Sequence, residues 1–268
     1  MNDISNALQM ALKHHQAGQL KEAESFYHQI LQENPNHPDA LNLSGLIAHH
    51  TINLHFGLLP RYGGCYPITW SVLNGEKQAG STLHYMEENF DEGDIISQTS
   101  VPIKEETTAR ELFDSMSVAA AKLFSDTYPS LLEGTFKVSS QDMSRKPYYD
   151  NNSIDFNRDS IIDWTRTGEE IQRRICAFSF EPFQLPLTSL HLSNGKKSQA
   201  TITNTRLHNN SSSKNSGNAG HITEVTDSGR LTISTGNGDF IEIGLLNNQP
   251  PLEYIESLAC KPNNITFI

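Results

Sequence analysis

The sequence has few cysteines and no long apolar run, and each shortage excludes a class of protein. Its 268 residues include three cysteines, and none of them forms a Cys-x-x-Cys pair. An odd, scattered set is typical of free thiols in a reducing compartment and excludes a small disulfide scaffold. No apolar stretch approaches the length of a membrane span, and the first residues lack the core of a signal peptide. We therefore expect a cytoplasmic protein that does not enter a membrane.

Positive charge is also scarce. The chain carries 20 Lys and Arg against 31 Asp and Glu, which gives a formal net charge of -11. This balance excludes a broad basic surface of the kind that binds nucleic acid through its phosphates. Hydrophobic residues make up 36% of the chain, and its mean hydropathy is -0.48. A sizeable share of the chain must therefore lie in loops or solvated segments, although its length allows two or more domains.

Residues 1–50 have a helical pattern. We expect helices over residues 4–16 and 20–34, with Gly18 in the turn between them and Pro35 after the second. A second unit begins at Pro38, and the resulting period of 34 residues is the tetratricopeptide (TPR) pattern. The segment resembles a TPR in Gly18, Ala23, Tyr27 and Pro35, with Leu41 and Gly45 opening the next unit. A plain helical hairpin is the alternative, because signature positions such as Ala7 and His14 are not aromatic. The second repeat also stops abruptly near His50.

Residues 51–137 read as a mixed α/β segment. Strands are expected at 51–55, 81–86 and 95–103, and helices at 67–73 and 108–127. Thr108 and Glu111 have the spacing of a capping box, which predicts where the longer helix begins. Together these elements predict an open α/β domain.

The rest of the chain reads as a linker and a small β domain. Residues 138–160 are polar and predict the linker. In the domain that follows, 161–268, Thr167 and Glu170 cap a helix at 168–178. Short Thr- and Ile-rich strands then alternate with turn signals such as Asn237-Gly238, which predicts a partly open, OB-like β-barrel. Residues 208–218 form a low-complexity loop inside it.

The most informative stretch is INLHFGLLPRYGG, residues 52–64. Asn53 and His55 lie two residues apart on an expected strand, so they share one face, and a Pro/Gly-rich loop follows. An acidic turn, with Asp91 in the sequence Phe-Asp-Glu-Gly-Asp, follows the next strand. These features resemble the formyltransferases that use 10-formyltetrahydrofolate, whose pattern is Asn-x-His, then Leu-Leu-Pro-Arg/Lys and a glycine. The matching loop residues are Leu58, Leu59, Pro60, Arg61 and Gly64.

The resemblance implies a catalytic trio of Asn53, His55 and Asp91. Formyl transfer from a folate nitrogen to an amine passes through a tetrahedral oxyanion, so hydrogen-bond donors must point at it. Asn53 and a protonated His55 would be these donors. Asp91 would hold His55 and raise the pKa of its ring, or accept the amine proton through a water. Arg61 either contacts an anionic substrate or pairs with a carboxylate. We expect His84 to be structural, and no metal site.

The resemblance breaks before residue 52. The family has about a hundred residues there, forming the first half of its open sheet and part of the folate pocket, whereas here most of the 52 residues preceding Asn53 look like a TPR. We therefore expect a truncated catalytic domain with impaired formyl transfer. The alternative is an inactive remnant that acts as a TPR-mediated interaction module.

The acceptor amine is the open question. By motif the nearest family members are methionyl-tRNA formyltransferases, which must bind RNA. Residues 151–268 contain 10 Lys and Arg against 12 Asp and Glu. That acidic balance disfavours tRNA and favours a small amine such as an amino sugar.

Overall fold

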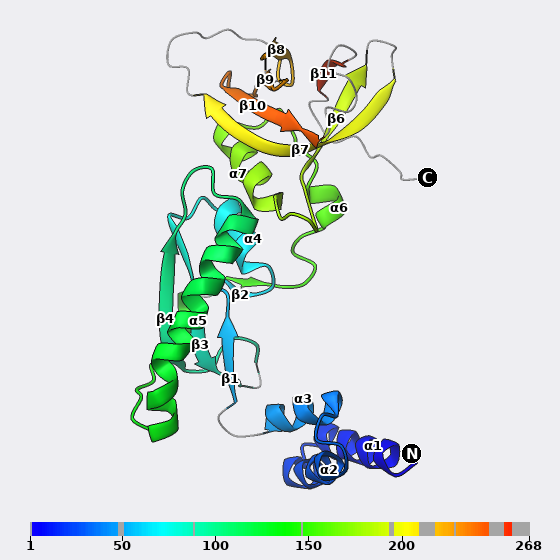
Figure 1. Ribbon diagram of the computed structural model, residues 1–268, viewed down its shortest axis with the longest axis vertical. Helices are drawn as coiled ribbons and strands as arrows, with labels where there is room; N and C mark the ends of the chain where they lie inside the picture. Colours follow the sequence, from blue (N-terminus) through cyan, green and yellow to red (C-terminus); the bar gives the residue numbers. More distant parts are fainter. Residues whose placement is uncertain are drawn as a thin grey trace.

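The computed structural model arranges the chain as a row of three parts, with a helical bundle at one end and a curled sheet at the other (Figure 1). It describes residues 2–47, 51–87, 89–145, 147–192, 196–208, 218–227, 229–246 and 255–258. Two features predicted above, the boundary near His50 and most of the low-complexity loop, lie outside these residues. No helix in these ranges is long and apolar enough to cross a membrane.

The bundle at the N-terminal end consists of three helices, α1 (Asn2–Gln16), α2 (Leu20–Glu33) and α3 (Pro38–Ile47). The first two match the expected helices, and Gly18 takes a left-handed φ of 71° in the turn between them. Their contact face is built from small and apolar side chains that are almost fully buried, namely Ala11, Ala23, Tyr27, Ile30 and Ala40. The small residues allow the helices to pack closely, with α3 against α2.

The middle part contains a sheet of three antiparallel strands in the order β1–β3–β4. These are β1 (Ile52–His55), β3 (Gln78–Tyr85) and β4 (Ile95–Pro102), close to the ranges expected from alternation. Among the described residues, β1 pairs with β3 only. Its other edge therefore carries no strand in this part of the chain.

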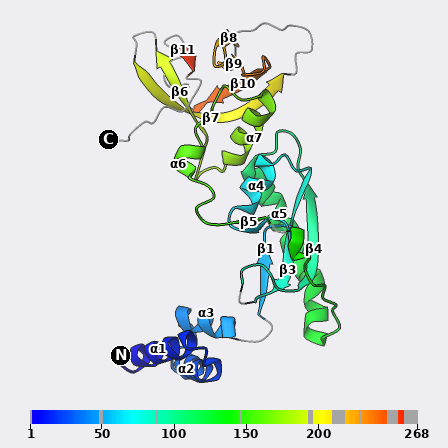
Figure 2. The same cartoon turned by 180° about the vertical axis from the view of Figure 1, so that it is seen from behind.

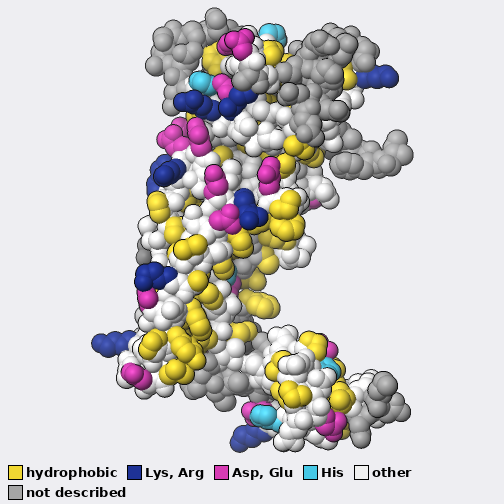
Figure 3. All heavy atoms as spheres, viewed as in Figure 1, with side chains coloured by type: hydrophobic (Ala, Val, Ile, Leu, Met, Phe, Trp, Pro, Cys, Tyr) yellow, Lys and Arg dark blue, Asp and Glu magenta, His cyan; other side chains and the backbone are white. Residues whose placement is uncertain are grey.

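Two helices cover this sheet. The shorter, α4 (Pro67–Leu73), has the expected bounds, whereas α5 (Ala109–Glu133) runs six residues beyond the expected end. The capping box of Thr108 and Glu111 is present at the start of α5. Its buried face joins a core with α4, β3 and the later helix α7 (Gly168–Phe178). The outer face of α5 exposes apolar side chains, visible in yellow in Figure 3. They include Val118, Phe124, Tyr128 and Leu132.

The segment expected to be a linker, residues 138–160, pairs with the middle part through a short strand. It contains a short 3₁₀ helix, η1 (Met143–Arg145), the strand β5 (Tyr148–Tyr149) and the helix α6 (Phe156–Asp159). β5 pairs in parallel with β2 (Gly63–Gly64), which lies in the Pro/Gly-rich loop. Figure 2 shows β5 lying beside α4 and above β1. The linker therefore closes over the loop that follows β1.

The C-terminal part is a curled antiparallel sheet with α7 packed against it. The capping box of Thr167 and Glu170 begins α7 as predicted. The strands, in the order β11–β6–β7–β10–β9–β8, are β6 (Leu187–Leu192), β7 (Lys197–His208), β8 (Ile222–Val225), β9 (Leu231–Ser234), β10 (Phe240–Leu245) and β11 (Ile255–Leu258). Curling brings the two edge strands, β11 and β8, into contact. Trp164 is fully buried in the core of this part.

Candidate active site

Four polar side chains share one face of the β1–β3 pair. Asn53 and His55 lie two residues apart on β1 and therefore point to the same face. The antiparallel register places His84 opposite Asn53 and Thr82 opposite His55. Side chains opposite each other on one face of a sheet lie within contact distance. Accordingly, Nδ2 of Asn53 lies 3.2 Å from Nε2 of His84. The register thus brings four polar side chains together on this face of the sheet.

Asp91 enters this cluster from the turn after β3. Its backbone has a left-handed φ of 59°, a conformation that aspartate tolerates better than most residues. The turn is tight, because a Cβ on Gly93 would lie 2.0 Å from the carbonyl oxygen of Tyr85. The Gly64 N–H donates to Oδ2 of Asp91 at 2.7 Å, and the Gln141 amide donates to the Asp91 carbonyl at 2.9 Å. The loop therefore holds the Asp91 carboxylate, and the linker holds the backbone of its turn.

The carboxylate of Asp91 lies between two histidines. Its Oδ1 is 3.7 Å from Nδ1 of His55 and 3.6 Å from Nε2 of His84. Burial opposes ionisation of Asp91, but the two histidines and the Gly64 N–H outweigh burial and hold its pKa below the usual value. Asp91 is therefore ionised at neutral pH.

The ring of His84 contacts the Tyr85 carbonyl, Asn53 and Asp91. Nδ1 lies 2.7 Å from the Tyr85 carbonyl, which can only accept, so Nδ1 carries a proton. Nε2 of His84 faces both the Asn53 amide nitrogen at 3.2 Å and Oδ1 of Asp91 at 3.6 Å. His84 therefore links the Asn53 amide to the Asp91 carboxylate.

His55 is enclosed by the loop that follows β1. Its side chain is 9% exposed, and Nε2 donates to the carbonyl of Tyr62 at 2.7 Å. Burial lowers the pKa of His55 and outweighs Asp91, whose charge acts in the opposite direction. Asp91 thus raises the pKa of His55 as expected, but the larger effect of burial, which the sequence does not show, sets the net direction. The resting ring is neutral at pH 7.

This lowered pKa predicts a pH dependence of stability. The unfolded chain binds a proton at His55 below about pH 6.5, whereas the folded chain resists it, so the free energy of unfolding falls as pH drops below that value. The slope is at most about 1.4 kcal/mol per pH unit for one proton. Urea unfolding between pH 7.5 and 5 should show a flatter slope for His55→Gln. The exposed His221, replaced by Gln, is the control, and an equal slope in both variants would contradict the prediction.

Thr82 pins the Pro/Gly-rich loop against the sheet. Its fully buried hydroxyl donates to the Gly57 carbonyl at 2.6 Å and accepts from the Leu59 N–H at 3.1 Å. The Gln98 amide donates both to this hydroxyl and to the Leu59 carbonyl. Leu59 is itself buried. These bonds fix the path of residues 57–62 over His55.

Removing this hydroxyl should loosen the loop. Thr82→Val keeps the shape of the side chain but leaves the buried Leu59 N–H without an acceptor, which costs about 1–3 kcal/mol. We expect a lower denaturation midpoint and faster hydrogen exchange at residues 57–62. Thr99→Val on the neighbouring β4 is the matched control. Equal protection of the loop in wild type and Thr82→Val would show that the hydroxyl does not anchor it.

The other predicted loop residues lie farther from the carboxylate. Arg61 pairs with Glu76, and its guanidinium lies 5.3 Å from the centre of the Tyr62 ring. The structure thus favours the carboxylate-pairing alternative for Arg61. Pro60 is partly buried and follows a cis peptide bond from Leu59. Gly64 has the most direct role, because its N–H contacts Asp91.

Sequence reasoning missed three residues that shape the site. His84 was expected to be structural, yet it touches both Asn53 and Asp91. Thr82 and Gln98 were not singled out, yet both hold the loop. Alternation along β3 would have placed Thr82 and His84 on one face, but only the antiparallel register shows that this face meets Asn53 and His55.

Two family models match the chain at these parts. Residues 42–128 match the model described as formyl transferase, and residues 156–254 match the formyl transferase C-terminal domain. The first match contains the site, and the second contains α7 and the described β6–β10. These two segments therefore belong to the formyl transferase family.

The curated proteins that resemble this chain include methionyl-tRNA formyltransferases. Methionyl-tRNA formyltransferase of Listeria innocua is 35% identical over 193 residues, which are 72% of this chain and 57% of that protein. The enzyme of the same name from Bacillus subtilis is 38% identical over 145 residues, 54% of this chain and 44% of its own length. The chain thus spans about half the length of the curated relatives it matches.

A solved structure shares the arrangement. It is the N-formyltransferase from Helicobacter canadensis, determined with folinic acid and dTDP-3-aminofucose. The similarity has a TM-score of 0.59 at 26% identity and covers 73% of this chain and 66% of the other. Much of the fold of the present chain is thus found in an N-formyltransferase solved with an amino-sugar nucleotide.

Proposed function

We propose that this chain transfers a formyl group from a reduced folate, 10-formyltetrahydrofolate, to the amine of an acceptor. The observation that supports this most is the convergence of Asn53, His55 and Asp91 in one polar cluster, within a segment that matches the formyl transferase family. If these residues were only solvent-facing polar positions of a strand, we would not expect a carboxylate from a separate turn to converge on the amide and the imidazole.

The chemistry assigns a role to each side chain. The acceptor nitrogen attacks the formyl carbon, the new C–N bond forms, and the folate C–N bond then breaks as the folate nitrogen regains a proton. Asn53 donates to the oxyanion of the tetrahedral intermediate. Neutral His55 takes a proton from the attacking amine, and Asp91, 3.7 Å away, stabilises the imidazolium that results. His84 keeps the Asn53 amide in place.

We expect the chain alone to work slowly. Nε2 of His55 holds its proton on the Tyr62 carbonyl, and the Asn53 amide is bonded to His84, so both side chains must change partner before they can act as base and donor on a substrate. In the described part of the chain, β1 also lacks a strand on one edge, which leaves the loop after it less supported. Turnover should fall well below that of the Listeria innocua enzyme assayed in parallel. Equal turnover would contradict this expectation.

The acceptor we favour is a small amine such as an amino sugar. The relatives include enzymes named for methionyl-tRNA and one solved with dTDP-3-aminofucose. RNA binding is driven by positive charge, and residues 151–268 carry an excess of acidic side chains. The curled sheet, which we regard as an OB-like domain, would then position a small acceptor rather than an RNA.

The remaining parts fit a division into a TPR-like segment (1–50), a truncated catalytic domain (51–137), a linker (138–160) and the C-terminal domain (161–268). The close packing of α1, α2 and α3 supports a TPR-like arrangement. A protein partner would bind this segment. Because α3 already packs on α2, the segment would present its outer helix faces to that partner.

Mass spectrometry tests the proposal directly. The chain is incubated with 10-formyltetrahydrofolate and a panel of dTDP-amino sugars, simple amines and methionyl-tRNA. We expect a formylated amino sugar and no formylated tRNA. Formylated methionyl-tRNA alone would overturn the choice of acceptor, and the absence of any formylated product after long incubation would overturn the proposed function.

A further inference from the structure

An aromatic stack joins three separate segments of the chain beside the proposed site. Tyr62 comes from the loop after β1, Trp70 from α4, and Tyr149 from β5 of the linker. The ring centres of Tyr149 and Trp70 lie 4.6 Å apart with an interplanar angle of 22°. Those of Tyr149 and Tyr62 lie 5.9 Å apart at 11°, so both pairs have a favourable stacked geometry. Tyr149 is therefore the ring that connects α4 to the loop.

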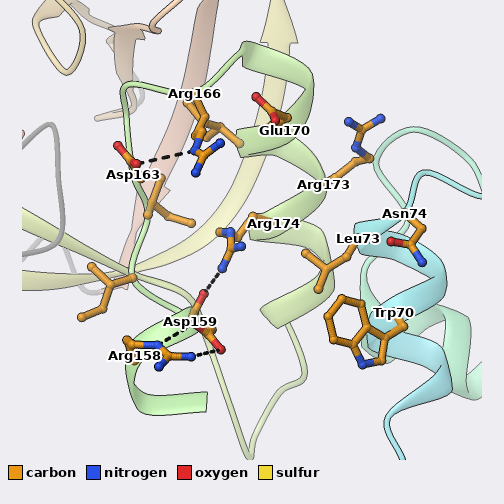
Figure 4. Close-up of a pocket in the computed structure, with 13 residues that line it drawn as sticks. Trp70, Leu73, Asn74, Arg158, Asp159, Asp163, Arg166, Glu170, Arg173 and Arg174 are labelled. Carbon is orange, nitrogen blue, oxygen red and sulfur yellow. Dashed lines mark hydrogen bonds and ion pairs between the residues drawn. The ribbon is translucent and has the colours of Figure 1, made fainter. Parts of the chain in front are cut away.

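Asn74, at the end of α4, ties the hydroxyl ends of the two tyrosines together. Its side-chain amide donates to the hydroxyls of Tyr62 and Tyr149, both at 3.2 Å. Asn74 lies one helical turn after Trp70, so α4 supplies both a ring and an amide to the stack (Figure 4). The Tyr62 hydroxyl donates in turn to Glu76 at 2.7 Å. Burial, with Glu76 adding to its effect, raises the pKa of Tyr62 to about 12, so this hydroxyl keeps its proton.

The backbone of Tyr62 needs such support. Its φ of 60° lies in the left-handed region, which is strained for a bulky residue unless neighbouring contacts hold it. This conformation sets the direction of the Tyr62 carbonyl, which accepts from Nε2 of His55 at 2.7 Å. The stack therefore reaches the imidazole of His55 through one backbone group.

The contact with Tyr62 fixes how the His55 ring is turned. A carbonyl can only accept, so Nε2 carries the ring proton at rest. The other nitrogen, Nδ1, then faces Oδ1 of Asp91 at 3.7 Å. When a substrate amine replaces the carbonyl as the partner of Nε2, a ring held in this way keeps the orientation in which Asp91 stabilises the imidazolium.

The backbone of Tyr149 makes a separate contact with the same loop. Its carbonyl accepts from the Cys65 N–H at 2.6 Å, next to the paired strands β2 and β5. The neighbouring Gly64 N–H holds Oδ2 of Asp91. A substitution of the Tyr149 side chain removes the stack but leaves these backbone bonds available. The role of the ring can therefore be tested separately from that of the strand.

We propose that Tyr149 is a positioning residue, whose ring holds Tyr62 in its left-handed conformation and so keeps the Tyr62 carbonyl on Nε2 of His55. The linker is then part of the machinery that prepares the site. A Tyr149 that only stabilised the fold would leave the state of the His55 ring unchanged when it was replaced. The effect on the ring belongs to the free chain, whereas the effect on the rate rests on the proposed formyl transfer.

NMR of the histidine rings tests this proposal without folate or amine. Long-range proton–nitrogen spectra show which ring nitrogen carries the proton, and the His55 signals are assigned from their loss in His55→Gln. At neutral pH we expect the Nε2–H form in the wild-type chain. In Tyr149→Leu the ratio of the Nε2–H form to the Nδ1–H form should fall about fivefold or more, which corresponds to the loss of one hydrogen bond. Tyr149→Phe keeps the rings stacked and should retain the wild-type signals.

Tyr128→Leu is the matched control for the NMR experiment. Tyr128 is an exposed tyrosine of α5 whose ring contacts Phe124 on the same helix, so its replacement should leave the His55 signals unchanged. The proposal is overturned by unchanged His55 signals in Tyr149→Leu, or by equal changes in Tyr149→Phe or in Tyr128→Leu. Tyr149→Met decides the test if Tyr149→Leu proves unfolded by circular dichroism.

Single-turnover formyl transfer shows whether the position of the ring matters for the reaction. We expect the rate to fall about tenfold in Tyr149→Leu and to stay near the wild-type value in Tyr149→Phe. A wild-type rate in Tyr149→Leu, despite altered His55 signals, would overturn the positioning role. Absence of formyl transfer by the wild-type chain would instead contradict the proposed function, and the NMR result would still decide what holds the His55 ring.

Discussion

Replacing Asp91 with Asn is expected to lower the rate of formyl transfer by about a hundredfold or more. The new side chain has the same shape, and its oxygen still accepts from the Gly64 N–H, so the turn should remain folded. The carboxylate charge beside Nδ1 of His55 is lost, and the imidazolium that forms during the reaction is no longer stabilised. Single-turnover assays with enzyme in excess measure this effect even when turnover is slow.

Asp94→Asn is the matched control for this prediction. Asp94 lies three residues farther along the same acidic turn, and its backbone carbonyl accepts from the Tyr85 N–H. The substitution removes the same charge from the same turn, but the Asp94 side chain does not contact His55. Equal losses in the two variants would show that the effect comes from the charge of the turn as a whole, and would refute a specific role of Asp91.

The second large effect is expected for Gly64→Ala. Gly64 has a φ of 89°, and a Cβ there would lie 2.1 Å from the carbonyl oxygen of Tyr149. That oxygen is part of the β2–β5 contact and also accepts from the Cys65 N–H. The two segments must separate, so we expect a loss of about 3 kcal/mol or more in the free energy of unfolding. Formyl transfer should fall as well, because Asp91 loses its backbone donor.

Gly238→Ala separates the effect of backbone strain at a positive φ from the effect of the steric contact with Tyr149. Its φ of 83° is similar, but no atom lies within 4 Å of the added Cβ. It should cost about 1–2 kcal/mol from backbone strain alone and leave formyl transfer unchanged. Chemical denaturation with both variants measures the difference. Similar losses would mean that the contact with Tyr149 adjusts easily and does not hold the site together.

Local elements were predictable where the sequence carries its own signals. The capping boxes at Thr108 and Thr167 and the Asn53–His55 alternation each depend on neighbours within a few residues, and the structure shows the corresponding helices and strand. The extent of α5 was not predicted, because the helix continues through Pro129 to Glu133, beyond the expected end at residue 127.

The details of the site depend on long-range contacts that the sequence does not show. His84 meets Asn53 across 31 residues, and the Gly64 N–H meets Asp91 across 27. The burial that lowers the pKa of His55 also comes from the fold, because the loop after β1 encloses the ring, and it outweighs the hydrogen bond to the Tyr62 carbonyl, which raises that pKa. Residue type and spacing indicated the chemistry, whereas protonation state and hydrogen-bond partners required the structure.

Binding of 5-formyltetrahydrofolate, a stable relative of the proposed donor, tests the central proposal most directly because it does not require turnover. Calorimetry should show saturable binding by the wild-type chain, weaker binding by His55→Ala and Asp91→Asn, and unchanged binding by Asp94→Asn. Such a result would mean that the cluster around Asn53 recognises the folate. Absence of binding, or equal affinity in all four proteins, would contradict the assignment of this cluster as a formyltransferase site.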